Sequence, residues 1–223
     1  MLCTSLVNLG HSVTVIDKFY FSRSSLNHLR YFKNFNLIFG DIRSKTLVKK
    51  HIKNKRINIL DIGTGTGCIL LSILKELNFS RGTGIDISSK AIETAKINSR
   101  NLNLLNQAKF KVFDLNKYNI GKYDLIVSNP PYIPSRDIKN LSKDIINYEP
   151  LIALEGGLDG LDLIKKVIYK STILLKKKGL LAIEIGNQQY LKVSNLLKFH
   201  GFKEKSREYD FNRNVRCIIS TKT

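Results

Sequence analysis

Short apolar runs alternate regularly with helical stretches from residue 57 onward, and few folds accommodate that order. Such runs are typical of strands buried on both faces, and the stretches between them have the apolar spacing of helices. Strands that alternate with helices form a mostly parallel sheet covered by helices on both faces. We expect strands at Ile57–Asp61, Thr83–Asp86, Phe110–Phe113, Tyr123–Ser128, Leu180–Ile185, Lys203–Tyr209 and Arg216–Ser220, and helices at Cys68–Leu77, Ser89–Asn101 (capped by Ser88 or Ser89), Leu161–Leu175 and Gln188–Phe199.

The size and apolar content of the chain fit one α/β domain with a short appendage. The chain has 223 residues, of which 43% are hydrophobic. It contains no run of about 18 apolar residues, and Asn8 and His11 interrupt the apolar amino terminus, which is unlike a signal peptide. The three cysteines are far apart and suggest no metal site. We therefore expect a cytoplasmic protein with no membrane contact and no metal.

The formal net charge of +19 indicates an acidic partner such as RNA, the ribosome or an acidic protein surface. Lysines cluster in residues 49–56 and again at Lys176, Lys177 and Lys178. The second cluster precedes Gly179, where we expect a helix to end, and cations there complement the helix dipole. Solvated faces of a chain rich in Lys, Asn and Ile are the favoured interpretation of both clusters.

The stretch "LDIGTGTG", residues 60–67, combines a strand end, a glycine-rich turn and a helix start. In sheets of this kind, ligands bind beyond the carboxyl ends of the strands. Glycines let the backbone approach a ligand closely, and the loop amides face it at the helix amino terminus. The turn alone is a weak signal, since such turns also serve dinucleotides and plain packing. The candidate cofactor residues here are Gly63, Thr64, Gly65, Thr66 and Gly67.

Two further strand ends carry acidic residues. Asp86 lies 19 positions after Gly67, where a carboxylate accepts hydrogen bonds from both hydroxyls of a ribose. Asp114 and Leu115 end the next strand and are candidates to hold an adenine, Asp114 by accepting from the exocyclic amine and Leu115 by covering the ring. The alternatives are a helix-capping role for Asp86 and a turn role for Asp114. Together these sites describe an adenosine along one rim of the sheet.

The stretch "SNPPY", residues 128–132, ends the strand next to that rim. Pro130 and Pro131 remove two backbone donors and fix two φ angles. Asn129 also lies where the reactive end of the cofactor would project. Its side-chain oxygen and the Pro130 carbonyl can accept the two N–H bonds of a planar NH2 group, and Tyr132 can stack on the flat substrate. A site that orients the NH2 group in this way needs no strong base, because the proton becomes acidic only as the bond to carbon forms. The alternative is a structural turn, which Asn-Pro often opens.

This stretch resembles the Asn/Asp-Pro-Pro-aromatic signature of class I methyltransferases that act on exocyclic or amide nitrogens. Residues 147–161, "NYEPLIALEGGLDGL", and 184–189, "EIGNQQ", are similar to the peptide chain release factor glutamine methyltransferases. The resemblance runs from about Arg43 to Thr223. It implies a Rossmann-like, seven-stranded, mostly parallel sheet with helices on both faces, S-adenosylmethionine as cofactor, and a release factor as partner.

The same resemblance assigns roles to the candidate residues. The family methylates the side-chain amide of a glutamine in a Gly-Gly-Gln tripeptide. In that family Asn-Pro-Pro-Tyr binds the amide, which here implies Asn129, Pro130, Pro131 and Tyr132. S-adenosylmethionine would lie on residues 63–67, Asp86 and Leu115.

The first 42 residues do not fit that family, whose amino-terminal helical domain and Arg-Pro-x-Thr-Glu joint are represented only by "RSKTLV", residues 43–48. Residues 9–43 instead resemble the second and third strands of an NAD-dependent nucleotide-sugar epimerase, in which Asp17 would hold the NAD ribose. No glycine-rich first turn precedes it, so we expect no NAD binding. Val13–Ile16 and Asn36–Phe39 are strand candidates in this α/β appendage, which is too short for an independent domain.

Two other functions are compatible with the sequence. An adenine-N6 methyltransferase acting on DNA or RNA uses the same four residues on an adenine NH2, and the charge of +19 favours it. Residues 147–161 and the absence of a recognised base-reading domain oppose it. The other is a degraded protein that binds S-adenosylmethionine without activity.

Overall fold

A seven-stranded sheet forms the centre of the protein. The computed structural model describes residues 13–17, 35–39, 56–77, 79–141, 150–210 and 213–223. The strand order is β5-β4-β3-β6-β7-β9-β8, and β9 runs antiparallel to both of its neighbours. The strands are β3 (Asn58–Ile62), β4 (Arg81–Asp86), β5 (Ala108–Val112), β6 (Tyr123–Ser128), β7 (Leu175–Glu184), β8 (Phe202–Tyr209) and β9 (Val215–Lys222).

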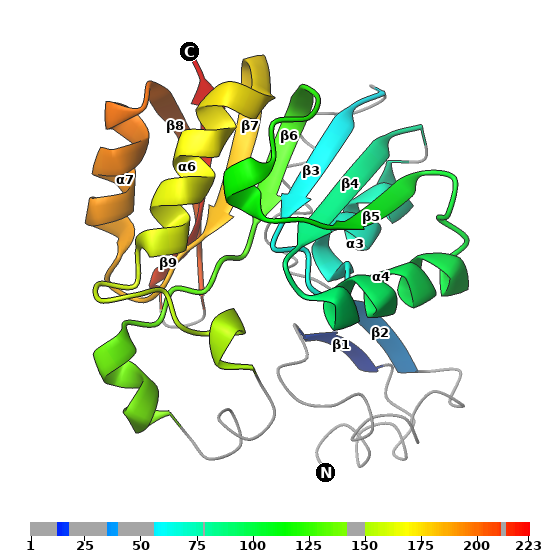
Figure 1. Ribbon diagram of the computed structural model, residues 1–223, viewed down its shortest axis with the longest axis horizontal. Helices are drawn as coiled ribbons and strands as arrows, with labels where there is room; N and C mark the ends of the chain where they lie inside the picture. Colours follow the sequence, from blue (N-terminus) through cyan, green and yellow to red (C-terminus); the bar gives the residue numbers. More distant parts are fainter. Residues whose placement is uncertain (1–12, 18–34, 40–55, 78, 142–149, 211–212) are drawn as a thin grey trace.

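Helices cover both faces of this sheet. They are α3 (Cys68–Glu76), α4 (Ser89–Asn101), α6 (Asp162–Leu174) and α7 (Tyr190–Phe199). Because side chains alternate along a strand, Ile59 and Leu125 pack in the cluster under α3 and α4, whereas Leu60 and Ile126 pack in the cluster under α6 and α7. The carboxyl ends of the parallel strands point toward the bottom of Figure 1, and their amino ends lie at the top. The sheet therefore has one core on each face. We call the end of the sheet where the carboxyl ends of the parallel strands lie the carboxyl edge, and the end where their amino ends lie the amino edge.

The mostly parallel sheet with helices on both faces confirms the predicted architecture. Helix α4 and strand β6 have the predicted bounds, and the Ser88 side chain caps α4 by accepting a hydrogen bond from the Ala91 amide at 3.3 Å. The remaining elements differ by one to five residues at an end. The irregular stretch before α6 contains the short 3-10 helices η3 (Ser135–Asn140) and η4 (Leu151–Ala153), and η2 (Leu115–Lys117) follows β5.

The prediction for the lysines at 176–178 is wrong. Helix α6 ends at Leu174, and the lysines lie at the start of β7 rather than in a last helical turn before Gly179. The cause is sheet pairing: Leu175 is buried and lies opposite Tyr123 of β6, so the chain enters the sheet there. The three lysines therefore lie in a strand beyond the last turn of α6, and no helix ends at Gly179.

Two short strands lie in the first 42 residues. They are β1 (Val13–Asp17) and β2 (Phe35–Phe39), which pair in parallel and form a separate two-stranded sheet. Both strand predictions for this region are confirmed, and Asp17 is the last residue of β1. The predictions for residues 43–48, most of the 49–56 cluster and residues 147–149 fall outside the described residues.

Candidate functional site

The loop between β3 and α3 lies open toward the carboxyl edge of the sheet. Gly63 and Gly65 have φ angles of +67° and +54°, which side chains other than glycine rarely adopt. A Cβ placed on either glycine would meet no atom within 4 Å. The loop is held from behind, because the Thr64 amide donates to the Ile85 carbonyl at 3.0 Å and the Asn98 side chain donates to the Thr66 carbonyl at 2.9 Å. Two bare peptide units thus face open space.

Asp86 joins this loop to the end of β4. Its Oδ2 accepts a hydrogen bond from the Gly65 amide at 2.8 Å, and its Oδ1 accepts one from the Ser88 amide at 2.9 Å. Each carboxylate oxygen has two lone pairs, so both keep capacity for a ligand hydroxyl. The next residue, Ile87, is 59% exposed and offers an apolar surface beside the carboxylate. Its exposure was not evident from the sequence.

Asp114 and Leu115 follow β5 on the same edge. The Asp114 side chain caps η2 by accepting a hydrogen bond from the Asn116 amide at 2.8 Å. The Leu115 side chain is only 8% exposed and belongs to the core under α6 and α7. The structure thus places both residues after β5, with Asp114 half-buried and Leu115 turned mainly toward the core.

Asn129 emerges beside the glycine loop. Ile62 of β3 pairs with Ser128 of β6, and the Ser128 hydroxyl donates to the Ile62 carbonyl at 2.8 Å, so Gly63 and Asn129 leave the sheet side by side. The Asn129 side chain is half-buried and makes no hydrogen bond with any described residue. Within the same part of the chain, the Pro130 carbonyl also accepts none. The Asn129 side-chain oxygen and the Pro130 carbonyl are therefore available to accept hydrogen bonds from a ligand next to the glycine loop.

Two glycine-containing segments support the proline turn. The Ile133 amide donates to the Leu154 carbonyl at 3.0 Å, and the Gly156 amide returns a bond to the Ile133 carbonyl at 2.8 Å. The Gln189 side chain donates to the Tyr132 carbonyl at 3.0 Å. A Cβ on Gly160 would lie 2.3 Å from the same Tyr132 carbonyl oxygen, so only glycine fits there. The segments 150–161 and 184–189, singled out in the sequence, thus pack against residues 129–133.

Tyr132 is anchored at its hydroxyl by a charged pair, of which Glu184 is buried and Arg216 is partly buried. Arg216 of β9 donates from Nη2 to the Tyr132 hydroxyl at 2.7 Å, and its guanidinium carbon lies 5.1 Å from the centre of the Tyr132 ring. Glu184, at the end of β7, lies 3.7 Å from Arg216 and 3.4 Å from the Tyr132 hydroxyl. The sequence reasoning missed Arg216 and gave Glu184 no role. An acidic residue closing an apolar strand was the available signal for Glu184.

Asp61 is a third residue near this end of the sheet to which the sequence reasoning gave no role. Its side chain is 1% exposed, and Oδ2 accepts a hydrogen bond from the Thr64 hydroxyl at 2.7 Å. Oδ1 is buried and has no hydrogen-bond partner in the described part of the chain. Burial raises the pKa of Asp61 from 3.8 to about 7, against the opposing effects of the Thr64 hydroxyl and the Leu70 backbone amide, and the nearby Asp86 raises it further.

Within the described ranges there is no group of three or more His, Cys, Asp or Glu side chains placed to hold a metal ion. None of the helices in those ranges has the length and apolar content needed to cross a membrane.

The sheet order, the glycine loop and the acidic strand ends define a class I methyltransferase fold, the fold of enzymes that use S-adenosylmethionine. Among solved structures, the chain is similar to a ribosomal protein L11 methylase from Lactobacillus delbrueckii subsp. bulgaricus, with a TM-score of 0.59, 18% identity, and coverage of 96% of this chain and 95% of that one. It is also similar to TrmN from Thermus thermophilus, with a TM-score of 0.57, 19% identity, and coverage of 81% and 48%.

Residues 37–157 match the model of the methyltransferase small domain, and the chain belongs to that family. A release factor glutamine methyltransferase of Rhodospirillum rubrum is 41% identical over 73% of this chain and 50% of its own length. One from Clostridium acetobutylicum is 40% identical over 76% and 60%. A bifunctional methyltransferase of Rickettsia bellii is 39% identical over 78% and 31%. The chain thus spans about half the length of the curated relatives it matches.

Proposed function

We propose that this protein transfers a methyl group from S-adenosylmethionine to the side-chain amide nitrogen of the glutamine in the Gly-Gly-Gln tripeptide of a peptide chain release factor. The observation that carries the proposal is the pair of available acceptors, the Asn129 side chain and the Pro130 carbonyl, next to the open glycine loop. The names of the similar curated proteins support the choice of substrate.

The residues at the carboxyl edge fit S-adenosylmethionine, which supplies an electrophilic methyl group when bound. The open space along Gly63 and Gly65 admits an adenosyl group against bare backbone, and Asp86 offers two carboxylate oxygens to the ribose hydroxyls. Asp86 and Glu184 end β4 and β7 at this edge, and Asp61 is the residue before the last of β3. A sulfonium cation bound there would be favoured by the acidic strand ends. Asp114 is the candidate acceptor for the adenine amine.

The amide nitrogen of glutamine is a weak nucleophile, because its lone pair is delocalised into the carbonyl. Asn129 Oδ1 and the Pro130 carbonyl would each accept one of its N–H bonds and aim the nitrogen at the methyl carbon. As the nitrogen–carbon bond forms and the sulfur–carbon bond breaks, positive charge develops on nitrogen. The two oxygens would stabilise that charge, and the extra proton would pass to bulk solvent as the product leaves the covered site. Tyr132, fixed by Arg216, would cover the flat amide group and exclude water from it.

The test is single-turnover transfer of labelled methyl to a purified release factor. We expect transfer to the glutamine of the intact tripeptide and none to a release factor in which that glutamine is replaced by alanine. Asn129→Ala should lower the rate by about 100-fold or more, since one orienting hydrogen bond in a dry site contributes several kcal/mol to the transition state. Asn101→Ala, an exposed asparagine at the end of α4, is the matched control and should keep the wild-type rate.

Nucleic acid and S-adenosylhomocysteine arms separate the other two functions. Transfer to adenine in DNA or RNA, with none to the release factor, would assign the chain to the nucleic-acid alternative. Binding of S-adenosylhomocysteine without transfer to any of them would identify a binding protein that lacks activity. Limited proteolysis tests the proposed domain division, in which residues 43–223 form the methyltransferase domain and residues 1–42 form no independent domain. A stable folded fragment released from residues 1–42 would contradict it.

A further inference from the structure

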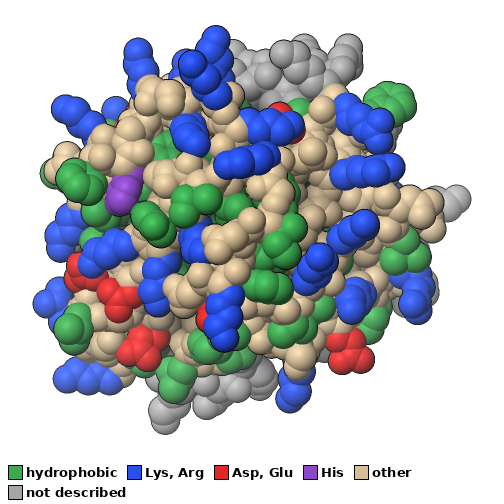
Figure 2. Space-filling model, turned by 45° about the horizontal axis from the view of Figure 1, so that its top comes forward, with side chains coloured by type: hydrophobic (Ala, Val, Ile, Leu, Met, Phe, Trp, Pro, Cys, Tyr) green, Lys and Arg blue, Asp and Glu red, His purple; other side chains and the backbone are tan. Residues whose placement is uncertain are grey.

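Cations gather at the amino edge of the sheet, opposite the candidate site. Figure 2 turns the top of Figure 1 toward the viewer, and Lys and Arg side chains are spread over that upper part with few acidic ones between them. Each strand of the sheet has one Lys or Arg at its end on this side, either within its last two residues there or up to two residues outside the strand. These cations are Arg56 before β3, Arg81 of β4, Lys109 of β5, Lys122 before β6, Lys176 of β7, Lys203 of β8 and Lys222 of β9.

Helix dipoles do not account for this arrangement. The helices run opposite to the parallel strands, so their carboxyl ends lie at the same edge, and Lys75, Arg100 and Lys198 in their last turns complement those dipoles. Arg81 and Lys109 instead belong to strands and lie in no helical turn. Their position at the edge therefore needs another explanation.

Acidic neighbours do not neutralise the edge either. Two acidic residues of the described chain lie at the strand starts and helix ends of this edge. Asp124 of β6 is already ion paired with Lys176 at 2.8 Å, and Glu76 ends α3 next to Lys75. Arg81 and Lys109 are exposed and form no ion pair with any residue that the structure describes. The edge thus keeps a net positive charge.

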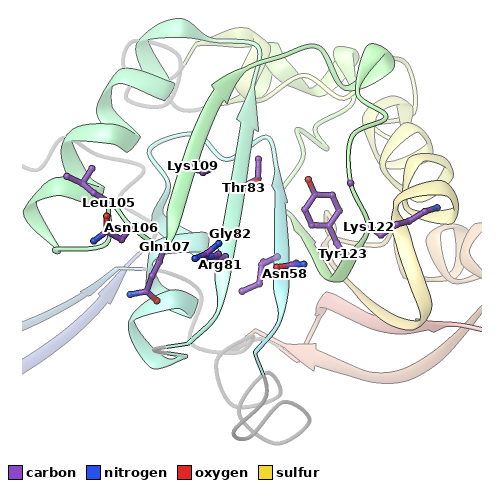
Figure 3. A pocket seen from close by; sticks show the side chains of 12 residues that line it. Asn58, Arg81, Gly82, Thr83, Leu105, Asn106, Gln107, Lys109, Lys122 and Tyr123 are labelled. Atoms are coloured by element: carbon purple, nitrogen blue, oxygen red, sulfur yellow. The ribbon is translucent and has the colours of Figure 1, made fainter.

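A pocket of about 560 Å³ opens at this edge between the starts of β3, β4, β5 and β6. Figure 3 shows Arg81 near Gln107, with Asn58 on the neighbouring strand and Lys122 directed away from the centre. Lys122 donates to the Ile173 carbonyl, so its charge stays on the rim of the pocket. The lining therefore combines cations with the carboxamide groups of Asn58, Asn106 and Gln107.

We infer that the amino edge is a docking surface for single-stranded RNA. Phosphates along a strand match a row of cations, and six intervals of about 4.8 Å between seven strands spread that row over about 29 Å. The carboxamides can both donate hydrogen bonds to and accept them from a ribose 2′-hydroxyl or the edge of a base. An acidic peptide or a lipid headgroup has neither a ribose 2′-hydroxyl nor a base. A duplex groove is read by a protruding helix or β-ribbon, and no described helix projects from this edge.

RNA bound there would lie on the side of the sheet away from Asn129, so it would be a partner rather than the methyl acceptor. The proposal is accordingly independent of the proposed methyl transfer. Loss of RNA binding and loss of methyl transfer are separate results.

The test is fluorescence anisotropy with a labelled single-stranded RNA of about 20 nucleotides, titrated from about 50 mM to about 300 mM salt. The edge variant is Arg81→Glu/Lys109→Glu/Lys177→Glu, in which Lys177, the exposed neighbour of Lys176 near the start of β7, is changed so that the Lys176–Asp124 ion pair stays intact. The control is Lys90→Glu/Lys166→Glu/Lys192→Glu, whose exposed lysines lie in the amino-terminal halves of α4, α6 and α7, on the opposite side. Both variants change the formal charge equally, so only the position of the charge differs.

We expect the edge variant to weaken RNA binding by more than about 10-fold and to reduce the slope of log affinity against log salt by about 2, since each contact to a single strand contributes about 0.7. The control should bind within about threefold of wild type. A corresponding triple Gln variant, with half the charge change, should give an intermediate loss, and S-adenosylhomocysteine binding checks that each variant is folded.

Equal weakening by the edge and control variants would overturn the inference, because it would reflect net charge alone. Affinity for DNA of the same sequence, for polyglutamate or for anionic phospholipid vesicles that matches or exceeds the affinity for RNA would also overturn it. Failure of the wild type to bind RNA at about 50 mM salt would have the same meaning.

Discussion

Replacing Asp61 by asparagine should remove a pH-dependent loss of stability from this protein. The Asp61 carboxyl is buried, its Oδ1 has no partner among the described residues, and its pKa in the folded chain is about 7 against an ordinary value of 3.8. Below about pH 3 the group carries its proton in both states. As the pH rises, the unfolded chain releases this proton first, so the free energy of unfolding falls until the folded group also ionises near pH 7.

The full difference corresponds to about 4 kcal/mol, and more than half of it falls between pH 5 and pH 8. That is a sizeable share of the 5–15 kcal/mol that stabilises an ordinary domain. Asparagine has nearly the same shape, and its oxygen can still accept the Thr64 hydroxyl bond, but it does not ionise. The stability gain of the variant over wild type should therefore grow by about 2 to 3 kcal/mol from pH 5 to pH 8.

Urea unfolding of both proteins at several pH values measures this gain, provided that the m-values agree. Asp162→Asn removes an exposed carboxylate at the start of α6 and controls for the loss of one negative charge. Parallel stability profiles for wild type and Asp61→Asn between pH 5 and pH 8 would refute the reasoning. In that case the Asp61 pKa would not differ between the folded and unfolded chain.

Three further predictions concern the carboxyl edge. Asp86→Ala should weaken S-adenosylhomocysteine binding by about 1–3 kcal/mol in calorimetry, while NAD should not bind the wild type; NAD binding of equal strength would contradict this. Asn129→Asp should keep partial methyl transfer, since its carboxylate still accepts an N–H bond, whereas Asn129→Ala should lose nearly all of it; equal single-turnover rates for wild type and Asn129→Ala would exclude the residue from the mechanism. Arg216→Leu should raise KM for the release factor and lower kcat by about 10-fold, while its affinity for S-adenosylhomocysteine stays unchanged. Arg216→Lys should restore part of the lost activity. Weaker cofactor binding in Arg216→Leu would instead indicate a general structural defect.

The parts of the site that depend on local pattern were predictable. Gly63, Gly65 and Asp86 lie at the ends of consecutive strands, so the glycine turn and the rule for ligand positions were enough to bring them to one edge. The same reasoning found Asn129, because an apolar strand precedes the two prolines. Each of these predictions needed only the direction of neighbouring parallel strands.

The parts that depend on distant pairing were not predictable. Arg216 reaches Tyr132 because β9 inserts between β7 and β8, and nothing in the local sequence specifies that strand order. The start of β7 was predicted five residues too late for a related reason, since Leu175 pairs with Tyr123 of β6 and so begins the strand. Asp61 was read as part of a strand, and its burial with an unpartnered oxygen became visible only in three dimensions.

The insertion of β9 also determines the order in which a newly synthesised chain becomes competent. Strands β3, β4 and β5 pair with neighbours close in sequence, whereas β9 enters between two strands that have already been made. Arg216, whose guanidinium holds Tyr132, follows it by 84 residues in the sequence and is therefore synthesised later. During synthesis, the glycine loop and Asp86 can therefore take shape well before the aromatic wall of the amide pocket, so a nascent chain would gain its cofactor site first and its substrate site last.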